Sequence, residues 1–580
     1  MNEEQTPKEF GFKKSPKIIN YIRQFSATEK AIFGVFVIAA IVATFVMAGK
    51  INAHFMTQIP ASGGELREGV IGLPRSINPV LAITDVDRDI SSLVYSGLLK
   101  WSNGKLVPDL AKSYKVSDDG LTYSFILRDD VHFQDGTPLT ADDVAFTIQK
   151  IQDTVLKSPR KLDWANVTVQ VVAPTEIHFV LKQAYSPFLT NATIGILPKH
   201  IWNTVNDDQF IFSQYNIEPV GSGPYKIDSV KTDSASIPTS YKLSTWSNYY
   251  DKVPYLSTIS FTFFGDEDKA LSAIDNGTID SLATVGATEA AKLATDKAAS
   301  YTVLQSPLPR IFGVFFNQNQ APVLADKVVR MALDMSVDRK SIVDKVLSGY
   351  GMPTDEPLPS AIVDDVDATV KSPDIAGAQA LLEKNGWKKD ASGIYAKTNA
   401  KKAVQTISFD IYTADTPDLK QAAEMVKASW EMMGAQVDLR VFNASDLYQN
   451  VIRTRKYDAL LFGELIGKDR DLYAFWHSSQ IKAPGLNVAM YANSKVDKLL
   501  EDIRTTSDDD MRASKYTQFE DLLTADLPAV FLYSPNFIYV VPKTLNGINL
   551  RDITIPSDRW NSVSSWYLTT ENVWKFFASK

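Results

Sequence analysis

The chain has 580 residues, of which 45% are hydrophobic and 22% charged, so it is long enough for two or three globular domains. The net charge of −8 and the lack of a basic patch argue against nucleic acid as a partner. The absence of cysteine excludes disulfides, thiolate metal ligands, a cysteine nucleophile and a lipid-modified N-terminal cysteine.

An uncharged apolar run from Ala31 to Gly49 comes first along the chain. Its 19 residues are close to the length that crosses a bilayer, and six lysines and arginines precede it. This predicts a single-pass anchor in the cell membrane, with the N-terminus in the cytoplasm and the body outside. A cleaved signal peptide is the alternative, because Val46-Met47-Ala48 resembles a cleavage site. The length of the run favours the anchor, and both interpretations export the body.

The segment Gln58 to Gly64, QIPASGG, follows the apolar run. Small residues, one proline and paired glycines are typical of a flexible tether. We therefore expect residues 50–64 to form a linker.

Strand and helix patterns alternate from Glu65 onward, which indicates an α/β fold. In the first half, strands are expected at 66–71, 121–127, 167–172, 177–181, 225–230, 241–245 and 258–264, and helices at 87–99 and 266–276. In the second half, helices are expected within 323–346 and at 375–384, 419–433, 447–454, 496–505 and 512–526, and strands at 407–412, 436–442, 459–462 and 529–533.

The densest pattern of the chain is Leu121 to Thr147, LTYSFILRDDVHFQDGTPLTADDVAFT. It predicts a strand, a glycine turn at Asp135–Pro138 and then a helix. Thr140 is expected to cap that helix, with Asp143 as the reciprocal acid.

Motifs of enzymes and metal sites are missing. None of the five histidines has the spacing of a zinc-binding helix, and no Gly-x-Ser-x-Gly sequence occurs. Gly221–Lys226 lacks the spacing of a phosphate loop, and Asp508–Asp510 lacks the glycine and distal glutamate of a calcium loop. We therefore expect no catalytic residue, no metal site and no cofactor.

The Leu121–Thr147 block resembles the signature of the extracytoplasmic solute-binding proteins of ABC transporters, in particular the oligopeptide, dipeptide and nickel-binding group of family 5. Other segments are similar to that family and follow in the same order: Ser76–Pro79, Tyr95–Leu98, Pro219–Tyr225, Asn276–Asp280, Phe316-Asn317, Val329–Leu333, Val337–Arg339, Ala380–Trp387 and Asp471–Ser479. The resemblance covers nearly all of Glu65–Ile548.

The resemblance implies a periplasmic-binding-protein type II fold, in which crossing strands join two α/β lobes and an extra lobe is inserted early. The N-terminal helix would replace the lipid-modified cysteine of membrane-attached relatives. The expected organisation is a cytoplasmic segment (1–30), an anchor or uncleaved signal (31–49), a linker (50–64), lobe I (65–298, with the inserted lobe at about 90–184), lobe II (299–534) and a return to lobe I with a C-terminal tail (535–580).

The family mechanism is capture without chemistry. A ligand binds between the lobes, the lobes close by hinge motion, and the closed form docks on a membrane permease. The resemblance favours oligopeptides as ligands. Another solute, such as a nickel chelate or an oligosaccharide, and a ligand sensor acting through a partner are the alternatives, and a secreted hydrolase is disfavoured by the missing motifs.

Candidate ligand-binding residues follow from the same resemblance. Peptide-binding relatives hold the ligand's α-amino group with an aspartate shortly before the segment matched by Asp471–Ser479. Glu464 and Asp469 are the candidates here, although Glu464 also fits a strand end and Asp469 a solvated loop. Trp246 and Trp476 are candidates for stacking or for core packing. The remaining candidates, on loops that face the cleft in relatives, are Thr84, Asp85 and Asn317.

Overall fold

The structure is a computed structural model that describes Tyr21 and residues 24–358, 370–398, 403–468, 470–551 and 553–578. These residues form two compact units. One unit combines the chain up to Ala61 with the segment from Thr569, and the other runs from Ser62 to Leu568. Residues 1–20, most of the predicted cytoplasmic segment, lie outside the described residues.

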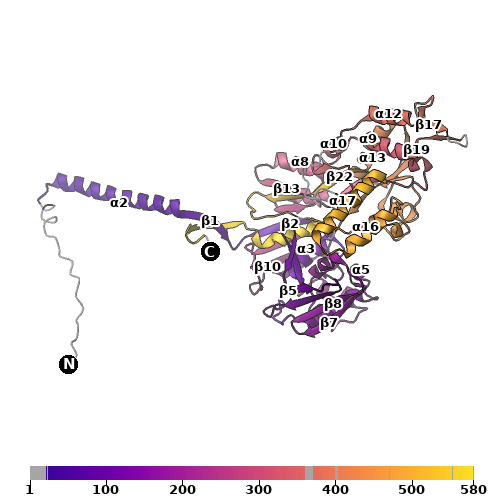
Figure 1. The fold of residues 1–580 in the computed structure, drawn as a ribbon. Helices are drawn as coiled ribbons and strands as arrows, with labels where there is room; N and C mark the ends of the chain where they lie inside the picture. Colours follow the sequence, from indigo (N-terminus) through magenta and orange to yellow (C-terminus); the bar gives the residue numbers. More distant parts are fainter. Residues whose placement is uncertain are drawn as a thin grey trace. The chain divides into compact units, whose positions relative to one another are not determined.

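Helix α2 (Ala27–Phe55) forms most of the first unit (Figure 1). It is apolar, has no buried residue and is long enough to cross a membrane. The Ser26 amide donates to the Glu29 carboxylate (2.7 Å) and the Glu29 amide donates to the Ser26 hydroxyl (3.3 Å), which closes a capping box. The helix therefore extends beyond the predicted 31–49 run at both ends.

Strand β1 (Met56–Ala61) follows α2 directly and pairs antiparallel with β23 (Thr569–Trp574). Residues 50–61 are therefore helix and strand, and not the predicted flexible linker. The reason is a partner strand more than 500 residues away in the sequence, which no local pattern reveals. The same pairing places the C-terminal tail in the unit of α2.

A mixed sheet of twelve strands runs through the described part of the second unit. Lobe I is built on β2 (Glu65–Ile71), β9 (Tyr225–Thr232), β10 (Pro238–Thr245), β11 (Thr258–Phe264), β12 (Ser281–Ala283) and β13 (Tyr301–Pro307). Lobe II is built on β14 (Arg310–Phe316), β15 (Gly351–Pro353), β19 (Ser408–Ala414), β20 (Gln436–Phe442) and β21 (Ala459–Leu465).

The two lobes are joined by the long strand β22 (Ala529–Pro542) and by the step from β13 to β14. The first residues of β22 pair with β14 and its last residues pair with β13 and β12. Where the chain crosses, the Leu308 amide donates to the Pro535 carbonyl (3.1 Å) and the Ser534 hydroxyl donates to the Leu308 carbonyl (2.8 Å). This confirms the predicted α/β architecture with crossing strands.

Helices cover the sheet in both lobes, with α7 against β2 and β11 and α13 against β19, β20 and β21. The main helices are α3 (Asp85–Val94), α7 (Glu267–Asp275), α8 (Ala287–Asp296), α9 (Lys327–Met335), α10 (Arg339–Val346), α12 (Ile375–Lys384), α13 (Pro417–Met433), α16 (Ser494–Thr505) and α17 (Asp509–Asp526). Shorter elements of lobe II are α14 (Ala444–Asp446), the π-helical turn η5 (Leu447–Ile452), α15 (Tyr473–Trp476) and the small sheet of β16 (Lys388–Lys389), β17 (Tyr395–Thr398) and β18 (Val404–Thr406).

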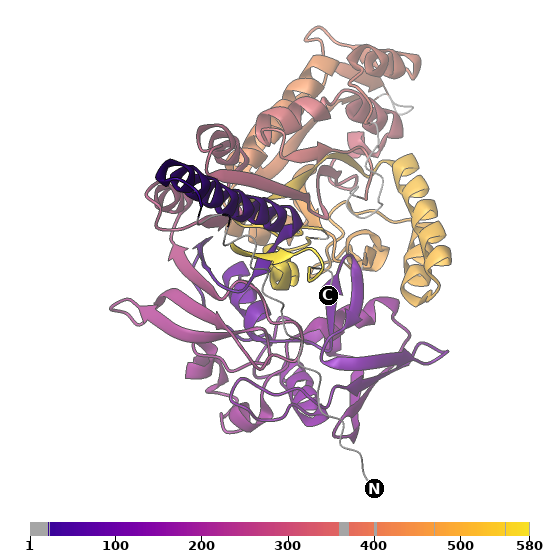
Figure 2. The same ribbon diagram turned by 90° about the vertical axis from the view of Figure 1, so that its left-hand side faces the viewer.

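An inserted lobe follows α3. Its elements are β3 (Leu99–Ser102), β4 (Lys105–Pro108), β5 (Ala111–Val116), β6 (Thr122–Leu127), α4 (Ala141–Gln152), α5 (Lys161–Trp164), β7 (Val167–Ala173), β8 (Glu176–Leu181) and the 3₁₀ segment η1 (Ser186–Thr193), with a sheet order of β5-β6-β8-β7. Figure 2 shows this lobe in purple and the salmon helices of lobe II, α9 and α12 among them, at opposite ends of the body, whereas α16 contacts η1 of the inserted lobe.

The Leu121–Thr147 block forms the expected strand and helix, β6 and α4. The Asp143 carboxylate accepts the Thr140 amide (2.8 Å) and the Thr140 hydroxyl (3.0 Å), and it also accepts the Lys199 amide (2.9 Å). The acid of the predicted cap therefore also ties the start of α4 to the start of the short helix α6 (Lys199–Trp202).

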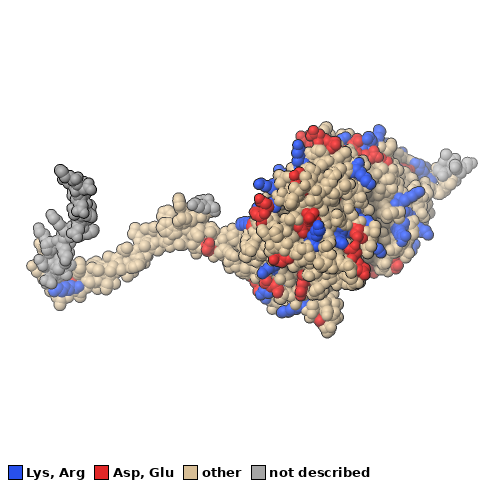
Figure 3. All heavy atoms as spheres, turned by 90° about the horizontal axis from the view of Figure 1, so that it is seen from below, with Lys and Arg blue, Asp and Glu red and all other residues tan. Residues whose placement is uncertain are grey.

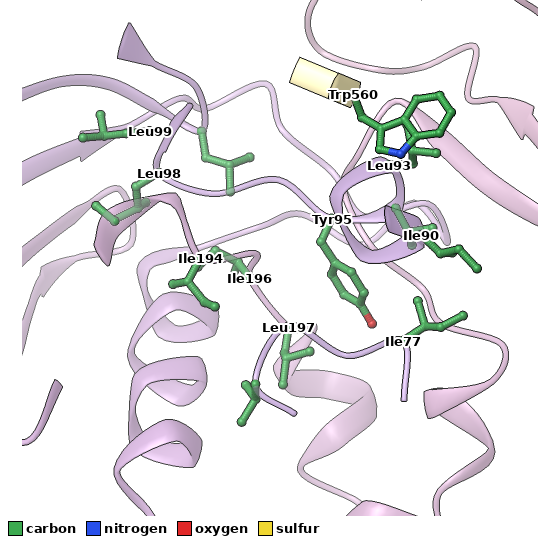
Figure 4. Close-up of a cluster of buried hydrophobic side chains, with 14 of the residues drawn as sticks. Ile77, Ile90, Leu93, Tyr95, Leu98, Leu99, Ile194, Ile196, Leu197 and Trp560 are labelled. Atoms are coloured by element: carbon green, nitrogen blue, oxygen red, sulfur yellow. The ribbon is translucent and has the colours of Figure 1, made fainter. Parts of the chain in front are cut away.

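The core of lobe I extends into the loop between α3 and β3 and into the C-terminal return of the chain. Figure 4 shows Ile90, Leu93 and Tyr95 of the α3 region in one buried cluster with Trp560 of η7 (Pro556–Ser565). The segment near the C-terminus is thus part of the core on which α3 rests.

Arg559 of η7 is fully buried with two carboxylates. Its guanidinium donates to Asp89 of α3 (2.8 Å) and to Glu68 of β2 (2.9 Å). The Tyr539 hydroxyl of β22 also donates to Glu68 (2.8 Å). Burial raises the pKa of Glu68 and Asp89, and the charge of Arg559 opposes that rise. One cation therefore connects the C-terminal return to two elements of lobe I, α3 and β2.

Replacing Arg559 by methionine is expected to lower the free energy of unfolding by about 3–5 kcal/mol, because two buried carboxylates lose their counter-charge. Urea unfolding monitored by circular dichroism measures the loss. Arg551→Met is the control, since Arg551 is exposed and precedes η7. Equal losses in the two variants would show that the buried cluster does not stabilise the fold.

Candidate functional site

A cavity of about 600 Å³ lies between the two lobes. We call it the interlobe cavity. Lobe I and the inserted lobe supply most of its wall, including Arg88, Tyr95, Trp101, Asp109, Arg160 and Asp251. The C-terminal return supplies Asp558 and Trp560. Lobe II supplies Leu465, the last residue of β21, and Gly467 and Lys468 from the loop after it. A cavity of this size, lined by both lobes, has the dimensions of a small-ligand site.

Lys468 and Asp558 connect the two lobes at the wall of this cavity. Their charged groups lie 2.9 Å apart, and the side chains are only 10% and 15% exposed. The Thr554 and Ile555 amides donate to the other oxygen of Asp558, at 2.8 and 3.0 Å, and so fix its position. The Lys468 ammonium also lies 5.1 Å from the centre of the Trp101 ring. This ion pair is well shielded from water and joins lobe II to lobe I.

A second contact joins lobe II to the inserted lobe. The Tyr185 hydroxyl donates to Asp471 (3.2 Å), and Arg504 of α16 donates to both oxygens of the same carboxylate (2.7–3.0 Å). The Arg512 guanidinium donates to the Ser186 hydroxyl (2.9 Å). The lobes therefore touch at the wall of the interlobe cavity and at a second place, between lobe II and the inserted lobe.

The acidic residues that line the cavity are paired with cations. Lys100 lies between Asp109 (3.0 Å) and Asp251 (2.6 Å). Burial raises the pKa of Asp109, and the nearby Lys100 ammonium opposes this rise. The other two described lining carboxylates, Asp163 and Asp558, pair with Arg160 and Lys468. An ammonium group on a ligand would therefore have to displace one of these cations or use a carboxylate behind the wall.

Glu464 provides such a carboxylate. It is 2% exposed, and neither of its oxygens has a hydrogen-bond partner among the described residues. Burial raises its pKa well above the ordinary value. Glu464 is opposite Ile311 in the β14–β21 ladder, so both side chains share the face that packs on the core of lobe II. It does not line the interlobe cavity, but its neighbour Leu465 does.

The three candidate loop residues make local hydrogen bonds and do not line the cavity. The Thr84 hydroxyl accepts the Asp87 amide (3.1 Å) and caps α3, and Asp85 pairs with Arg88 (3.2 Å). The Asn317 side chain is 2% exposed, and its amide group donates to the Arg455 carbonyl (3.0 Å). Ordinary loop bonding accounts for all three, and their role in binding stays a prediction.

The two candidate tryptophans are buried and also lie outside the cavity wall. Trp476 packs in the core of lobe II, with its ring centre 6.0 Å from that of Phe315 and 6.1 Å from that of Phe531. The Trp246 amide donates to the carbonyl of Pro224, a residue that lines the cavity (2.8 Å). Core packing is thus what the structure shows for Trp476. Asp469, the other candidate for the amino group, lies outside the described residues.

Three of the family-like segments contribute residues to the cavity wall, whereas none of the described candidate binding residues does. The segments Ser76–Pro79, Tyr95–Leu98 and Pro219–Tyr225, matched by resemblance, each contribute residues to its wall. Trp101 and Asp558 were missed because nothing in their local sequence marks them. The fold brings Trp101 and Asp558 together with Lys468. Lys468 lies next to Asp469 in the sequence, one of the two residues expected to bind the ligand's α-amino group.

The comparisons with known proteins agree with this geometry. The family model described as "Bacterial extracellular solute-binding proteins, family 5 Middle" matches residues 105–483. The oligopeptide-binding protein AppA of Bacillus subtilis (strain 168) is 30% identical over 531 residues, which cover 88% of this chain and 92% of AppA.

Solved structures extend the likeness to the fold. The structure of B. subtilis AppA in complex with a nonapeptide has a TM-score of 0.66 at 28% identity, and covers 88% of this chain and 100% of that one. The structure of NikZ from Campylobacter jejuni in complex with Ni(L-His) has a TM-score of 0.67 at 27% identity, and covers 87% and 99%. The chain therefore belongs to family 5 of the bacterial extracellular solute-binding proteins.

Proposed function

We propose that this chain is the membrane-anchored solute-binding component of an ABC importer, that it captures peptides in the interlobe cavity, and that it delivers them to a permease. The observation that carries the proposal is the cavity of about 600 Å³ walled by both lobes. Ligand entry by hinge motion would break the Lys468–Asp558 pair at its wall and the contacts of Tyr185 and Ser186 with lobe II. The likeness to AppA supports oligopeptides as the ligand class.

The anchor part of the proposal rests on α2. In this proposal the helix is retained, the N-terminus is cytoplasmic and the body lies on the extracytoplasmic side. A tether of this kind raises the effective concentration of the binding lobes near the permease. Binding itself needs no chemical step, so the ligand leaves unchanged.

Isothermal titration calorimetry of the full chain in nanodiscs tests the ligand class. The ligands are peptides of three to nine residues, Ni(L-His) and an oligosaccharide set, and mass spectrometry of the recovered ligand follows. We expect heat on addition of peptides and recovery of intact peptide. Binding of the nickel complex or of sugars without peptide binding would assign the chain to another solute, and cleaved peptide would make it a hydrolase.

Glu464 is proposed as the partner of the ligand's α-amino group. Its carboxylate is buried, has no described hydrogen-bond partner and stands one residue from the cavity wall. An ammonium that reaches it would supply the missing counter-charge. A shift of the loop that begins at Leu465 would open that path.

The Glu464→Gln variant should bind peptides with a free amino terminus about 10-fold or more weakly, because a hydrogen bond to a charged group contributes about 1.5–3 kcal/mol. Its affinity for N-acetylated peptides should change much less. Calorimetry with matched peptide pairs measures both, and Glu431→Gln on the exposed face of α13 is the control. An equal loss of affinity for both peptide types would show that Glu464 does not bind the ligand's α-amino group.

The Glu464→Gln variant also tests, without ligand, whether burial raises the pKa of Glu464. Since burial raises the pKa of Glu464 in the folded chain, the unfolded chain loses this proton first as the pH rises from its ordinary pKa of 4.5. The wild type should therefore lose stability relative to Glu464→Gln, by up to about 1.4 kcal/mol per pH unit, until the folded-state pKa is passed. Thermal unfolding of both proteins from pH 4 to pH 8 measures the difference, and a difference that is constant with pH would contradict the account.

A further inference from the structure

The end of the chain returns to the outer end of helix α2. Beyond its pairing with β1, strand β23 brings Trp574 against the last turns of the helix. The Trp574 indole N–H donates to the Asn52 side chain (2.8 Å), and the Lys575 amide donates to the Phe55 carbonyl (2.7 Å). The Phe55 and Trp574 rings are stacked, with their centres 6.3 Å apart. Trp574 and Lys575 are therefore held against the C-terminal end of the helix.

This segment exposes large aromatic side chains. The exposed fractions are 48% for Trp574, 76% for Phe576 and 63% for Phe577. The two phenylalanine rings touch edge to face, with their centres 5.4 Å apart. Exposed aromatic rings beside a lysine are typical of protein segments at the surface of a bilayer, where the rings contact lipid and the ammonium stays in water.

The position of Phe55 and Trp574 along α2 agrees with a location at the surface of the bilayer. The uncharged run ends at Gly49, and Phe55 follows six residues later, about 9 Å further along the helix axis at 1.5 Å per residue. Figure 3 shows the helix without charged side chains along most of its length. The headgroup layer is about 5–8 Å thick on each side of the hydrocarbon core. If α2 spans the membrane, the Phe55–Trp574 pair lies at the outer edge of that layer.

We propose that Trp574, Phe576 and Phe577 form a second membrane contact, which inserts into the outer interface of the bilayer that α2 crosses. The inference rests on the proposed retention of α2 as an anchor. The β1–β23 pairing makes the contact a rigid extension of the helix end, and so fixes how the chain leaves the membrane.

The cysteine-free sequence allows a direct test, because one introduced cysteine is the only thiol. Phe576→Cys and Phe577→Cys are spin-labelled in the full chain, which is then reconstituted in nanodiscs with anionic lipid. Power saturation compares collisions with oxygen, which concentrates in lipid, and with a water-soluble nickel chelate. Phe212→Cys is the matched control, since Phe212 is 74% exposed on lobe I, and Glu571→Cys probes the same strand further from α2.

We expect a several-fold higher ratio of oxygen to nickel collisions at 576 and 577 than at 212 and 571. Equal ratios at all four sites in a chain of full intact mass would overturn the membrane contact and leave the anchor standing. Protection from both reagents would overturn it in favour of a protein partner. An intact mass that lacks α2 after expression would overturn the anchor, and the membrane contact with it, while peptide binding by the body is measured separately.

Discussion

The binding site depends on the buried ion pairs that the Arg559 guanidinium makes with Glu68 and Asp89. Arg559 holds η7 against Glu68 and Asp89 in lobe I, and the residues that follow and precede it in the chain form one wall of the interlobe cavity. Trp560 packs in the lobe I core, and Asp558 faces Lys468 of the other lobe. Because a buried charge without partners is costly, these ion pairs hold the return segment in this position. The cavity wall and the interlobe ion pair follow from that position.

A few polar contacts, and not a shared apolar core, hold the two lobes against each other. The core of each lobe is separate, and the strands that cross between them meet at Leu308 and Ser534. Between the lobes lie Lys468–Asp558 at the cavity wall, and Tyr185–Asp471 with Arg512–Ser186 between lobe II and the inserted lobe. When the lobes part, both groups of each contact are hydrated again, and this hydration offsets much of the lost interaction, whereas exposing an apolar core is not offset in this way. The lobes are therefore expected to separate as rigid bodies at the crossing strands.

Much of the fold was predictable because local patterns and family motifs agree. The block from Leu121 to Thr147 forms β6 and α4, and three of the segments matched by resemblance contribute to the cavity wall. Local patterns failed where distant segments pair. The tether pattern was assigned to Gln58–Gly64, but residues 56–61 form a strand with Thr569–Trp574. For Trp476 the sequence left stacking on a ligand and core packing open, and the side chain packs in the core of lobe II. The sequence around Arg559 does not predict its ion pairs, because only the fold brings Glu68 and Asp89 to it.

Capture by lobe closure is the central claim, and the distance between the lobes on ligand binding tests it most directly. Spin labels at Leu162→Cys in the inserted lobe and Lys495→Cys at the start of α16 flank the contact between η1 and α16. Double electron–electron resonance on the full chain should give a broad distance distribution without ligand and a shorter, narrower one with saturating peptide. A distribution that does not change while calorimetry shows bound peptide would contradict capture by closure.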